Sequence, residues 1–183
     1  MKNLELNEIS NITYLSRPTE KDDMSMTSPA TMFFTDFDQT EPLIVDASTS
    51  ADLARLLMLK AHAKLNLVVD SDDKVLGVVS LEEVSDQSIT AKLSKNIKRD
   101  TITVADLMVP KSNIQGLDYT QVEHADIETV IEHLKTNGQQ YCLVVDKGSN
   151  KIRGVFSAND ISRQLGVDID VQDQSSFYKV FSH

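Results

Sequence analysis

The sequence predicts an α+β fold in which a small unit of helix, strand, strand and helix is built twice. The string Leu67–Asp70 is followed by Gly77–Ser80, and the same pair of strings returns as Leu143–Asp146 and Gly154–Ser157. A shift of 76 positions aligns the two halves without a gap over the first strand and the helix before it. Internal repetition at this period indicates one supersecondary unit used twice. Helices and strands mixed within each unit favour small sheets covered by helices.

The first half begins with a helix and two strands. Ser50 can cap a helix over Ala51–Lys60 through its hydroxyl, and this stretch holds good helix formers and a broad apolar face. The continuous apolar run Leu65–Val69 is typical of a strand covered on both faces. A turn by composition follows, and Val75–Val79 is predicted to be the next strand.

A second helix is expected to close the first half. Ser80 is predicted to cap this helix, which would start near Leu81. The polar stretch from Ser85 to Thr103 is expected to contain a further short helix near Thr90–Lys95.

The second half repeats the plan, with the same reasons for each element. In order, we expect a helical turn over Val104–Met108 that ends before Pro110, a helix over Ile127–Lys135 capped by Asp126 and ended by Asn137-Gly138, strands over Tyr141–Val145 and Ile152–Phe156, and a helix from Ser157 through Leu165 closed by Gly166. We divide the chain into a polar N-terminal arm (1–26), repeat 1 (27–86), a linker (87–103), repeat 2 (104–166) and a C-terminal tail (167–183).

The composition excludes several classes of function. With 183 residues, 40% hydrophobic and 25% charged, the chain is expected to be an ordinary soluble globule. The net charge of −10 argues against a nucleic-acid partner, because no basic surface would neutralise phosphates. No apolar run approaches the ~20 residues of a membrane helix, and the N-terminus has no apolar signal core. The single cysteine, Cys142, favours a reducing cytoplasm and is expected to be a buried, inert thiol.

One motif carries a resemblance to a known family. Gly154–Asp160 reads as Gly, two apolar residues, Ser, two variable residues and Asp, and Val104–Pro110 provides a matching opening with Lys98-Arg99-Asp100 before it. The chain resembles the CBS-domain family over roughly 28–166, and looks like a tandem pair (a Bateman module) of the stand-alone bacterial type. The resemblance implies two repeats packed with pseudo-two-fold symmetry, and an adenosine-containing ligand in the cleft between them.

The chemistry of the motif agrees with such a ligand. The Gly lets a ligand's ring approach the backbone, and Ser157 at a helix N-terminus favours an anion. Asp160, one turn later, can accept two hydrogen bonds from a ribose diol. The alternative is a plain helix cap, in which Ser157 and Asp160 only stabilise the helix that they begin.

The first repeat departs from the motif. Gly77–Glu83 places Glu where Asp is expected, and Ser80 with Glu83 also forms an ordinary Ser-x-x-Glu capping box. We therefore list Ser80 and Glu83 as candidate ligand-binding residues, and predict that the second repeat binds better than the first.

The other candidate residues follow from position. Val109, Lys111 and Ile114, and Tyr141 with Cys142, are candidates to line an adenine slot, although a tyrosine in this position is more often part of the core or of an interface. Lys111, Arg153 and Arg163 are the cations nearest the motif in sequence, and each is also explained as a solvated surface charge. With so few local cations, AMP or adenosine is expected to bind more easily than ATP, unless bound Mg²⁺ supplies the missing charge.

No catalytic constellation or metal-ligand spacing occurs, so we predict that the chain is not an enzyme and holds no metal. The leading hypothesis is a cytoplasmic regulatory or sensor protein that binds an adenine nucleotide (AMP, ADP or ATP), forms a homodimer and acts on an unknown protein partner, without nucleic acid or membrane. The alternative is a constitutive dimeric scaffold with empty clefts. Exposed aromatic residues such as Phe177 and Tyr178 would suit either an interface or a small core.

Overall fold

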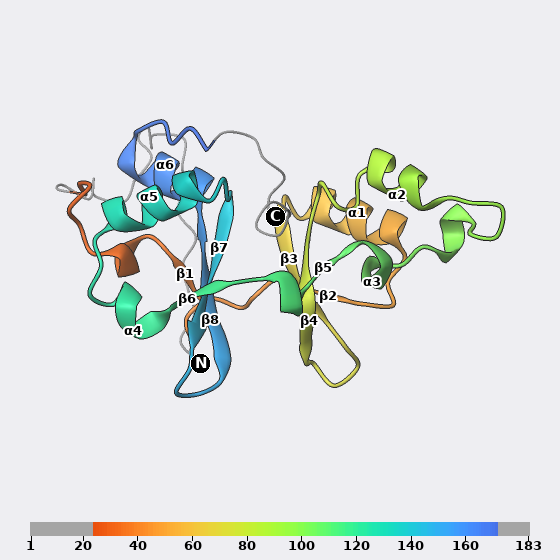
Figure 1. Cartoon of the computed structure of the whole chain (residues 1–183), viewed down its shortest axis with the longest axis horizontal. Helices are drawn as coiled ribbons and strands as arrows, with labels where there is room; N and C mark the ends of the chain where they lie inside the picture. The colour runs from red at the N-terminus through yellow and green to blue at the C-terminus, as the bar shows by residue number, and fades with distance from the viewer. Residues whose placement is uncertain (1–23, 172–183) are drawn as a thin grey trace, which may run out of the picture.

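The computed structural model describes residues 24–171, which form two lobes side by side (Figure 1). In each lobe a four-stranded sheet lies toward the middle of the molecule and the helices cover its outer face (Figure 1). The predicted arm 1–26 and tail 167–183 lie mostly outside the described residues, as do Phe177 and Tyr178.

The helices and strands of this α+β fold alternate along the chain in short elements. They are η1 (Ala30–Met32), β1 (Thr35–Asp36), β2 (Ile44–Asp46), α1 (Ala51–Lys60), β3 (Leu65–Val69), β4 (Val75–Ser80), α2 (Asp86–Lys92), η2 (Arg99–Thr101), α3 (Val104–Leu107), β5 (Val109–Pro110), η3 (Lys111–Asn113), β6 (Gly116–Asp118), α4 (Tyr119–Val122), α5 (Ile127–Thr136), β7 (Tyr141–Asp146), β8 (Lys151–Ser157) and α6 (Ala158–Leu165).

The two sheets repeat one pairing pattern. Their strand orders are β2-β3-β4-β5 and β6-β7-β8-β1, with a parallel pair at one edge and antiparallel pairs elsewhere. Both hairpins carry an irregularity at equivalent positions, between Val68 and Val69 and between Val144 and Val145. The duplication seen in the sequence is therefore a duplication of sheet topology.

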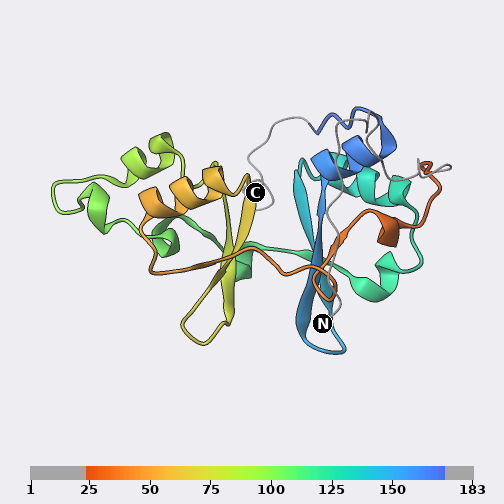
Figure 2. The ribbon, with the colours of Figure 1, turned by 180° about the vertical axis from the view of Figure 1, so that it is seen from behind.

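Each half lends its opening strand to the other. β1 precedes the first hairpin in sequence but pairs with β8, and β5 precedes the second hairpin but pairs with β4. We call residues 44–110 the first lobe, and residues 24–36 with 116–171 the second lobe. The blocks 27–86 and 104–166 thus do not coincide with the lobes, because the opening of each block packs on the other sheet. The linker 111–115 crosses between lobes in Figure 1, and the linker 37–43 crosses on the opposite side in Figure 2.

The motif glycines make this exchange possible. A Cβ on Gly77 would lie 2.2 Å from the carbonyl oxygen of Val109, and one on Gly154 would lie 2.2 Å from that of Thr35. Only glycine permits backbone this close. The group that approaches each glycine is therefore the exchanged strand of the same chain, and not a ligand ring as the sequence suggested.

The local signals placed most elements correctly. α1 and β3 have the predicted bounds, and Ser50, Asp126 and Ser157 cap α1, α5 and α6 with their side chains. Helix α5 extends one residue beyond the prediction, to Thr136, and Gly138 adopts the left-handed conformation (φ 59°).

The region after β4 was predicted wrongly. No helix begins at Leu81: residues 81–84 form a turn, and a single helix, α2, follows with Ser85 as its cap. The Glu83 carboxylate accepts a hydrogen bond from the N–H of Ser80 and closes this turn. The next helix begins only after Ser85, which caps α2. The helix expected over 90–95 is the same α2, displaced toward the N-terminus, and it lies partly within the predicted linker 87–103.

The apolar core consists of three clusters, one within each lobe and one between the lobes. One lies under the helices of each lobe, around Met58, Val68 and Ile102 in the first and around Ile131, Val144 and Phe156 in the second. The third lies between the sheets and joins the lobes. It contains Leu67, Val78, Val109, Tyr141 and Leu143, with Phe37, Leu65, Ile114, Ile152 and Val155 packed against it.

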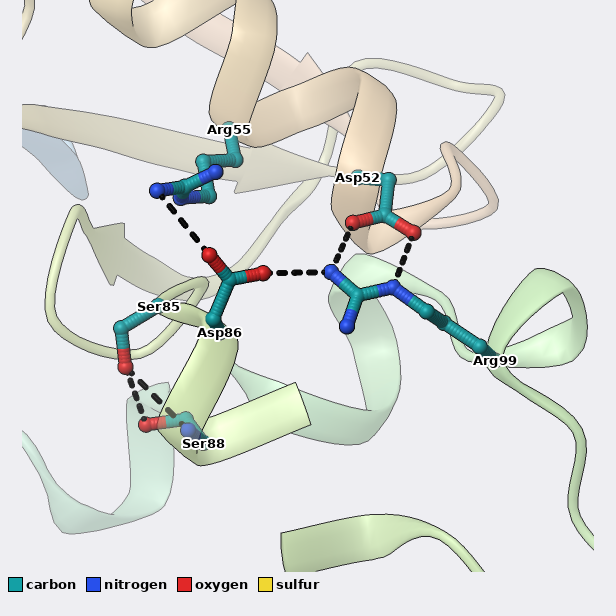
Figure 3. A network of polar contacts seen from close by, with 6 residues as sticks. All are labelled: Asp52, Arg55, Ser85, Asp86, Ser88 and Arg99. Atoms are coloured by element: carbon teal, nitrogen blue, oxygen red, sulfur yellow. Dashed lines mark hydrogen bonds and ion pairs between the residues drawn. The ribbon is translucent and has the colours of Figure 1, made fainter. Parts of the chain in front are cut away.

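An ion-pair network links Asp86 of α2 and Arg99 of η2 to helix α1 (Figure 3). Arg99 donates two hydrogen bonds to Asp52, at 2.8 and 2.6 Å, and one to Asp86 at 2.6 Å. Arg55 pairs with the other oxygen of Asp86 at 3.3 Å. Since these side chains are 38–61% exposed, the network contributes little to overall stability and mainly orients α2 beside α1.

Candidate functional site

A cavity of about 520 Å³ lies between the lobes, on the side where residues 37–43 cross. Its apolar floor belongs to the cluster between the sheets, and its polar walls come from the C-terminal end of α1 and the N-terminal end of α6. It is lined by Thr35, Phe37, Thr40, Glu41, Pro42, Leu43, His62, Ala63, Lys64, Leu65, Leu67, Tyr141, Leu143, Val155, Ser157, Asn159, Asp160 and Arg163. Both lobes therefore contribute to one site.

The Ser157–Asp160 motif reaches this cavity. Ser157 caps α6 by accepting a hydrogen bond from the backbone N–H of Asp160 at 3.3 Å. Within residues 24–171 the Asp160 carboxylate accepts a hydrogen bond from Arg163 Nη2 at 2.5 Å and none from the backbone, and its side chain is 40% exposed. The hydroxyl is thus used as a cap, while the carboxylate keeps acceptor capacity on the cavity wall.

The corresponding residues of the first lobe, Ser80 and Glu83, make different hydrogen bonds. The backbone N–H of Ser80 donates to Glu83 Oε2 at 2.6 Å, and the Ser80 hydroxyl accepts from the N–H of Glu82 at 3.2 Å. Ser80 is only 5% exposed. The two residues do not line the cavity, and their bonds close the turn over residues 81–84.

Tyr141 lies on the cavity floor and belongs to the cluster between the sheets. Burial, with a smaller contribution from the charge of Asp160, raises the pKa of its phenol to about 12. The hydroxyl therefore stays neutral at physiological pH and can act as a donor. Its neighbour Cys142 points to the other face of β7, into the core beneath α5 and α6, where burial raises the pKa of the thiol to about 11. Cys142 does not line the cavity.

Because the opening strands are exchanged, the other residues predicted to line an adenine slot lie outside this cavity. Val109 pairs with Val78 of β4 and is 1% exposed, and Ile114 packs against the same cluster between the sheets. Lys111 is exposed. Backbone hydrogen bonds from Lys74 and Asp72 lower the pKa of Asp70 in the β3–β4 turn, and the charge of Lys111 adds only a small contribution. None of the three lines the cavity that contains Asp160. Residues 35–43 occupy the equivalent place there.

Arg153 is held on a separate surface. It donates to Asp36 at 2.8 and 2.9 Å, lies 3.2 Å from Asp38, and stacks 4.2 Å above the ring centroid of Tyr119. The hydrogen bond from Arg153 lowers the pKa of Asp36 despite burial, and the pairing raises the pKa of Arg153. Arg153 lines a second cavity of about 530 Å³ beside η1 and β1, so its charge is already matched away from Asp160.

The sequence missed the contributions of the first lobe to the cavity. Lys64 and His62 follow α1 directly, and His62 adopts a left-handed backbone conformation (φ 53°) at that junction. Glu41 and Phe37 come from the crossing linker. Aligning the repeats marks 62–64 as equivalent to the residues just before Tyr141, a signal that would have suggested them once the exchange was known.

Residues 24–171 lack two further features. They contain no group of three or more His, Cys, Asp or Glu side chains arranged to hold a metal ion. None of their helices is long and apolar enough to cross a bilayer.

Comparison with known proteins agrees with the geometry. The family model described as the CBS domain matches residues 35–88. An uncharacterised conserved protein from Pyrococcus horikoshii shares the fold with a TM-score of 0.60 and 20% identity, over 80% of this chain and 98% of that one. No curated protein matched the chain.

Two further solved structures of this fold contain adenine nucleotides. CBSX2 in complex with AMP has a TM-score of 0.54 and 22% identity, over 74% of this chain and 94% of that one. CbpB in complex with c-di-AMP has a TM-score of 0.51 and 16% identity, over 77% of this chain and 86% of that one.

Proposed function

We propose that this chain, which carries a CBS domain and has the fold of CBS-domain proteins, is a regulatory module that binds an adenine nucleotide between its lobes. The observation that carries the proposal is the position of the Asp160 carboxylate on the wall of a cavity with an apolar floor. An adenine ring suits the floor, and a ribose diol suits a carboxylate with free acceptor sites.

The cavity also offers cations for a phosphate. Lys64 comes from the first lobe and Arg163 from the second, and both line the cavity. A nucleotide that engages Asp160 and Lys64 together would bridge the lobes. A ligand that binds one arrangement of the lobes better than another shifts the population between them, and this is how we expect binding to reach a protein partner.

The solved relatives support the class of ligand. The AMP of CBSX2 and the c-di-AMP of CbpB are both adenine nucleotides. Among AMP, ADP and ATP we propose AMP, because within residues 24–171 only Lys64 and Arg163 bring positive charge to the lining of this cavity, against the carboxylates of Glu41 and Asp160.

Calorimetric titration tests this function. The purified chain (residues 1–183) is titrated with adenosine, AMP, ADP, ATP and c-di-AMP, in parallel with Asp160→Ala. We expect one adenine nucleotide to bind to the wild type, and the substitution to weaken that binding at least about tenfold through loss of charge-assisted hydrogen bonds. Binding that is unchanged in the variant would place the ligand elsewhere.

A scaffold without a ligand is the second candidate. It is favoured by the internal use of the motif, since Ser157 caps α6 and Arg163 already neutralises Asp160. The absence of heat and of any thermal shift with every ligand named above would support the scaffold and reject the nucleotide site. Either function is non-catalytic, and for both we propose a homodimer.

A further inference from the structure

The linker 37–43, which crosses between the lobes (Figure 2), forms one wall of the proposed nucleotide cavity. Most of its residues line that cavity: Phe37, Thr40, Glu41, Pro42 and Leu43. At the first lobe the linker is held by the carbonyl oxygen of Leu43, which accepts from the N–H of Leu67 at 2.9 Å. Within residues 24–171, neither Glu41 nor Pro42 makes a hydrogen bond. The position of the wall therefore depends on how the two ends of the linker are held.

Asp36 organises the other end of the linker. Its Oδ1 accepts from the N–H of Asp38 at 2.9 Å. Its carbonyl oxygen accepts from the N–H groups of Gln39 and Thr40, at 3.0 and 2.8 Å. Three consecutive N–H groups of the linker are thus bonded to one residue, in a turn that an aspartate side chain closes on its own backbone. The place of this turn is set by the place of the Asp36 carboxylate.

Arg153 of β8 fixes that carboxylate from behind the wall. Its Nε and Nη2 donate to the two oxygens of Asp36 at 2.8 and 2.9 Å, and its carbonyl oxygen accepts from the N–H of Phe37 at 2.8 Å. The Arg153 and Asp36 side chains are 20% and 12% exposed, so solvent weakens this pair less than a surface pair. Thr35 and Thr40 line both the nucleotide cavity and the cavity that contains Arg153, so the start of the linker lies between the two.

The first lobe contains the same kind of turn without an arginine. Asp46 ends β2 as Asp36 ends β1, its Oδ1 accepts from the N–H of Ser48 at 2.7 Å, and its carbonyl oxygen accepts from the N–H of Thr49 at 3.0 Å. Asp46 is exposed, and no cation of residues 24–171 pairs with it. Such a turn therefore closes without a guanidinium. The buried pair at Asp36 has the additional effect of fixing the turn to the sheet.

We propose that Arg153 and Asp36 are positioning residues of the nucleotide site, which hold the start of the linker against β8 and so keep the cavity wall in place for a ligand. The inference rests on the nucleotide binding proposed above. Arg153 acts without touching the ligand, since neither residue lines that cavity. When the binding-competent arrangement is populated only in part, the apparent affinity falls by that fraction. A wall in place for a tenth of the time would thus bind about tenfold more weakly.

Calorimetry on Arg153→Gln with two ligands tests this role. We expect the affinities for AMP and for adenosine to fall by the same factor, about tenfold, because both ligands lose the wall. A direct contact between Arg153 and phosphate would instead weaken AMP alone. Ile131→Val is the matched control, since it truncates the core cluster of the second lobe, which contains no residue of the linker. It should lower stability and leave both affinities unchanged.

A double variant shows whether Arg153 acts through Asp36. In Asp36→Asn the charged pair is already lost, and the affinity for AMP should fall about as far as in Arg153→Gln. Adding Arg153→Gln to Asp36→Asn should then reduce the affinity little further, because residues that act as one unit are not additive.

Amide hydrogen exchange in the absence of ligand measures the linker itself. In Arg153→Gln the N–H groups of residues 38–40 should exchange at least about tenfold faster than in the wild type, because the turn opens more often. The N–H groups of residues 48 and 49, in the turn at Asp46, are the internal control and should exchange at the wild-type rate.

The outcomes separate this inference from the nucleotide site. A wild type that binds neither AMP nor adenosine would reject both. If the wild type binds, and Arg153→Gln keeps its affinity or loses it for AMP alone, the site stands and the positioning role is wrong. An equal loss in Ile131→Val would assign the effect to general destabilisation. Additive losses in the double variant, or unchanged exchange at residues 38–40, would also overturn the inference.

Discussion

Arg163 Nη2 lies 2.5 Å from Oδ1 of Asp160, three residues earlier on α6. The carboxylate proposed to hold a ribose is therefore already paired with a cation from its own helix. The Arg163 side chain is 78% exposed, so the pair is weak and can open at little cost. A nucleotide would use both partners, the carboxylate for its ribose and the guanidinium for its phosphate, whereas a nucleoside would only compete with the arginine.

Replacing Arg163 should separate these two ligands. In Arg163→Gln we expect adenosine to bind up to about fivefold more tightly, because an exposed ion pair no longer competes, and AMP to bind more weakly. Calorimetry with both ligands on the wild type and the variant measures the two changes. Arg55→Gln, which removes an arginine of the α1–α2 network, is the control. If the substitution changes the affinities for adenosine and AMP by the same factor, Arg163 does not contact the phosphate.

The two acidic residues of the motif should behave differently. Asp160→Ala should reduce nucleotide affinity with little change in the free energy of unfolding, since the carboxylate bonds only to an exposed arginine among the described residues. Glu83→Ala should leave affinity unchanged and destabilise the fold by about 1 kcal/mol, through loss of the bond to the N–H of Ser80. Titration and urea denaturation of both variants decide this. Equal losses of affinity would contradict the predicted advantage of the second lobe.

The glycine under the exchanged strand should be sensitive to a single methyl group. Gly154→Ala places a Cβ 2.2 Å from the carbonyl oxygen of Thr35, so β1 must move off β8. We expect a loss of about 2 kcal/mol or more in unfolding free energy, measured by urea denaturation. Gly148→Ala, where the nearest atom is a side-chain oxygen at 3.2 Å, is the control and should change stability far less. Similar losses for both would mean that the strand exchange tolerates the added atom.

The Asp36–Arg153 pair should make stability depend on pH in acid. The hydrogen bond from Arg153 lowers the pKa of Asp36 in the folded protein. The ionised carboxylate therefore stabilises the fold above the unfolded pKa of about 3.9, and this contribution disappears as the pH falls through the lower folded pKa. Asp36→Asn should cost about 2 kcal/mol at pH 7, because both side chains are largely buried, at 12% and 20% exposed.

Denaturation at several pH values measures that contribution. The difference between the wild type and Asp36→Asn should be constant above pH ~5 and shrink below pH ~4. Asp38→Asn is the control, since Asp38 is 65% exposed and contacts Arg153 only at 3.2 Å, and it should change little at any pH. A difference that stays constant into acid would show that ionisation of Asp36 does not matter to the fold.

Local chemistry explains how much of the fold could be predicted. The bounds of α1 and β3, and the caps at Ser50, Asp126 and Ser157, depend on neighbours within a few residues, which the sequence displays directly. The same kind of reasoning placed a helix at Leu81 and was wrong there. A Ser-x-x-Glu pattern can also close a single turn, and Ser85 offers a second cap four residues after Leu81.

The candidate site depended on contacts that local patterns do not contain. Ser157, Asp160, Tyr141 and Arg163 line one cavity, because α6 and β7 belong to the same sheet and its covering helices. Val109 and Lys111 were placed with them by analogy, but β5 pairs with β4 of the other lobe. Which loop faces which motif is set by pairing between strands far apart in the chain, and strand propensity carries no information about the partner.

The sequence by itself determined the duplication, the elements of each repeat and the motif that begins α6, because periodicity, capping and turn chemistry act over a few residues. Tertiary structure alone decided that the lobes exchange their opening strands, that Lys64 joins Asp160 at one cavity, and that four leucines of α1 remain outside the core. A helix that is apolar on both sides has two equally plausible buried faces in sequence. Only packing against the sheet selects one and leaves the other exposed.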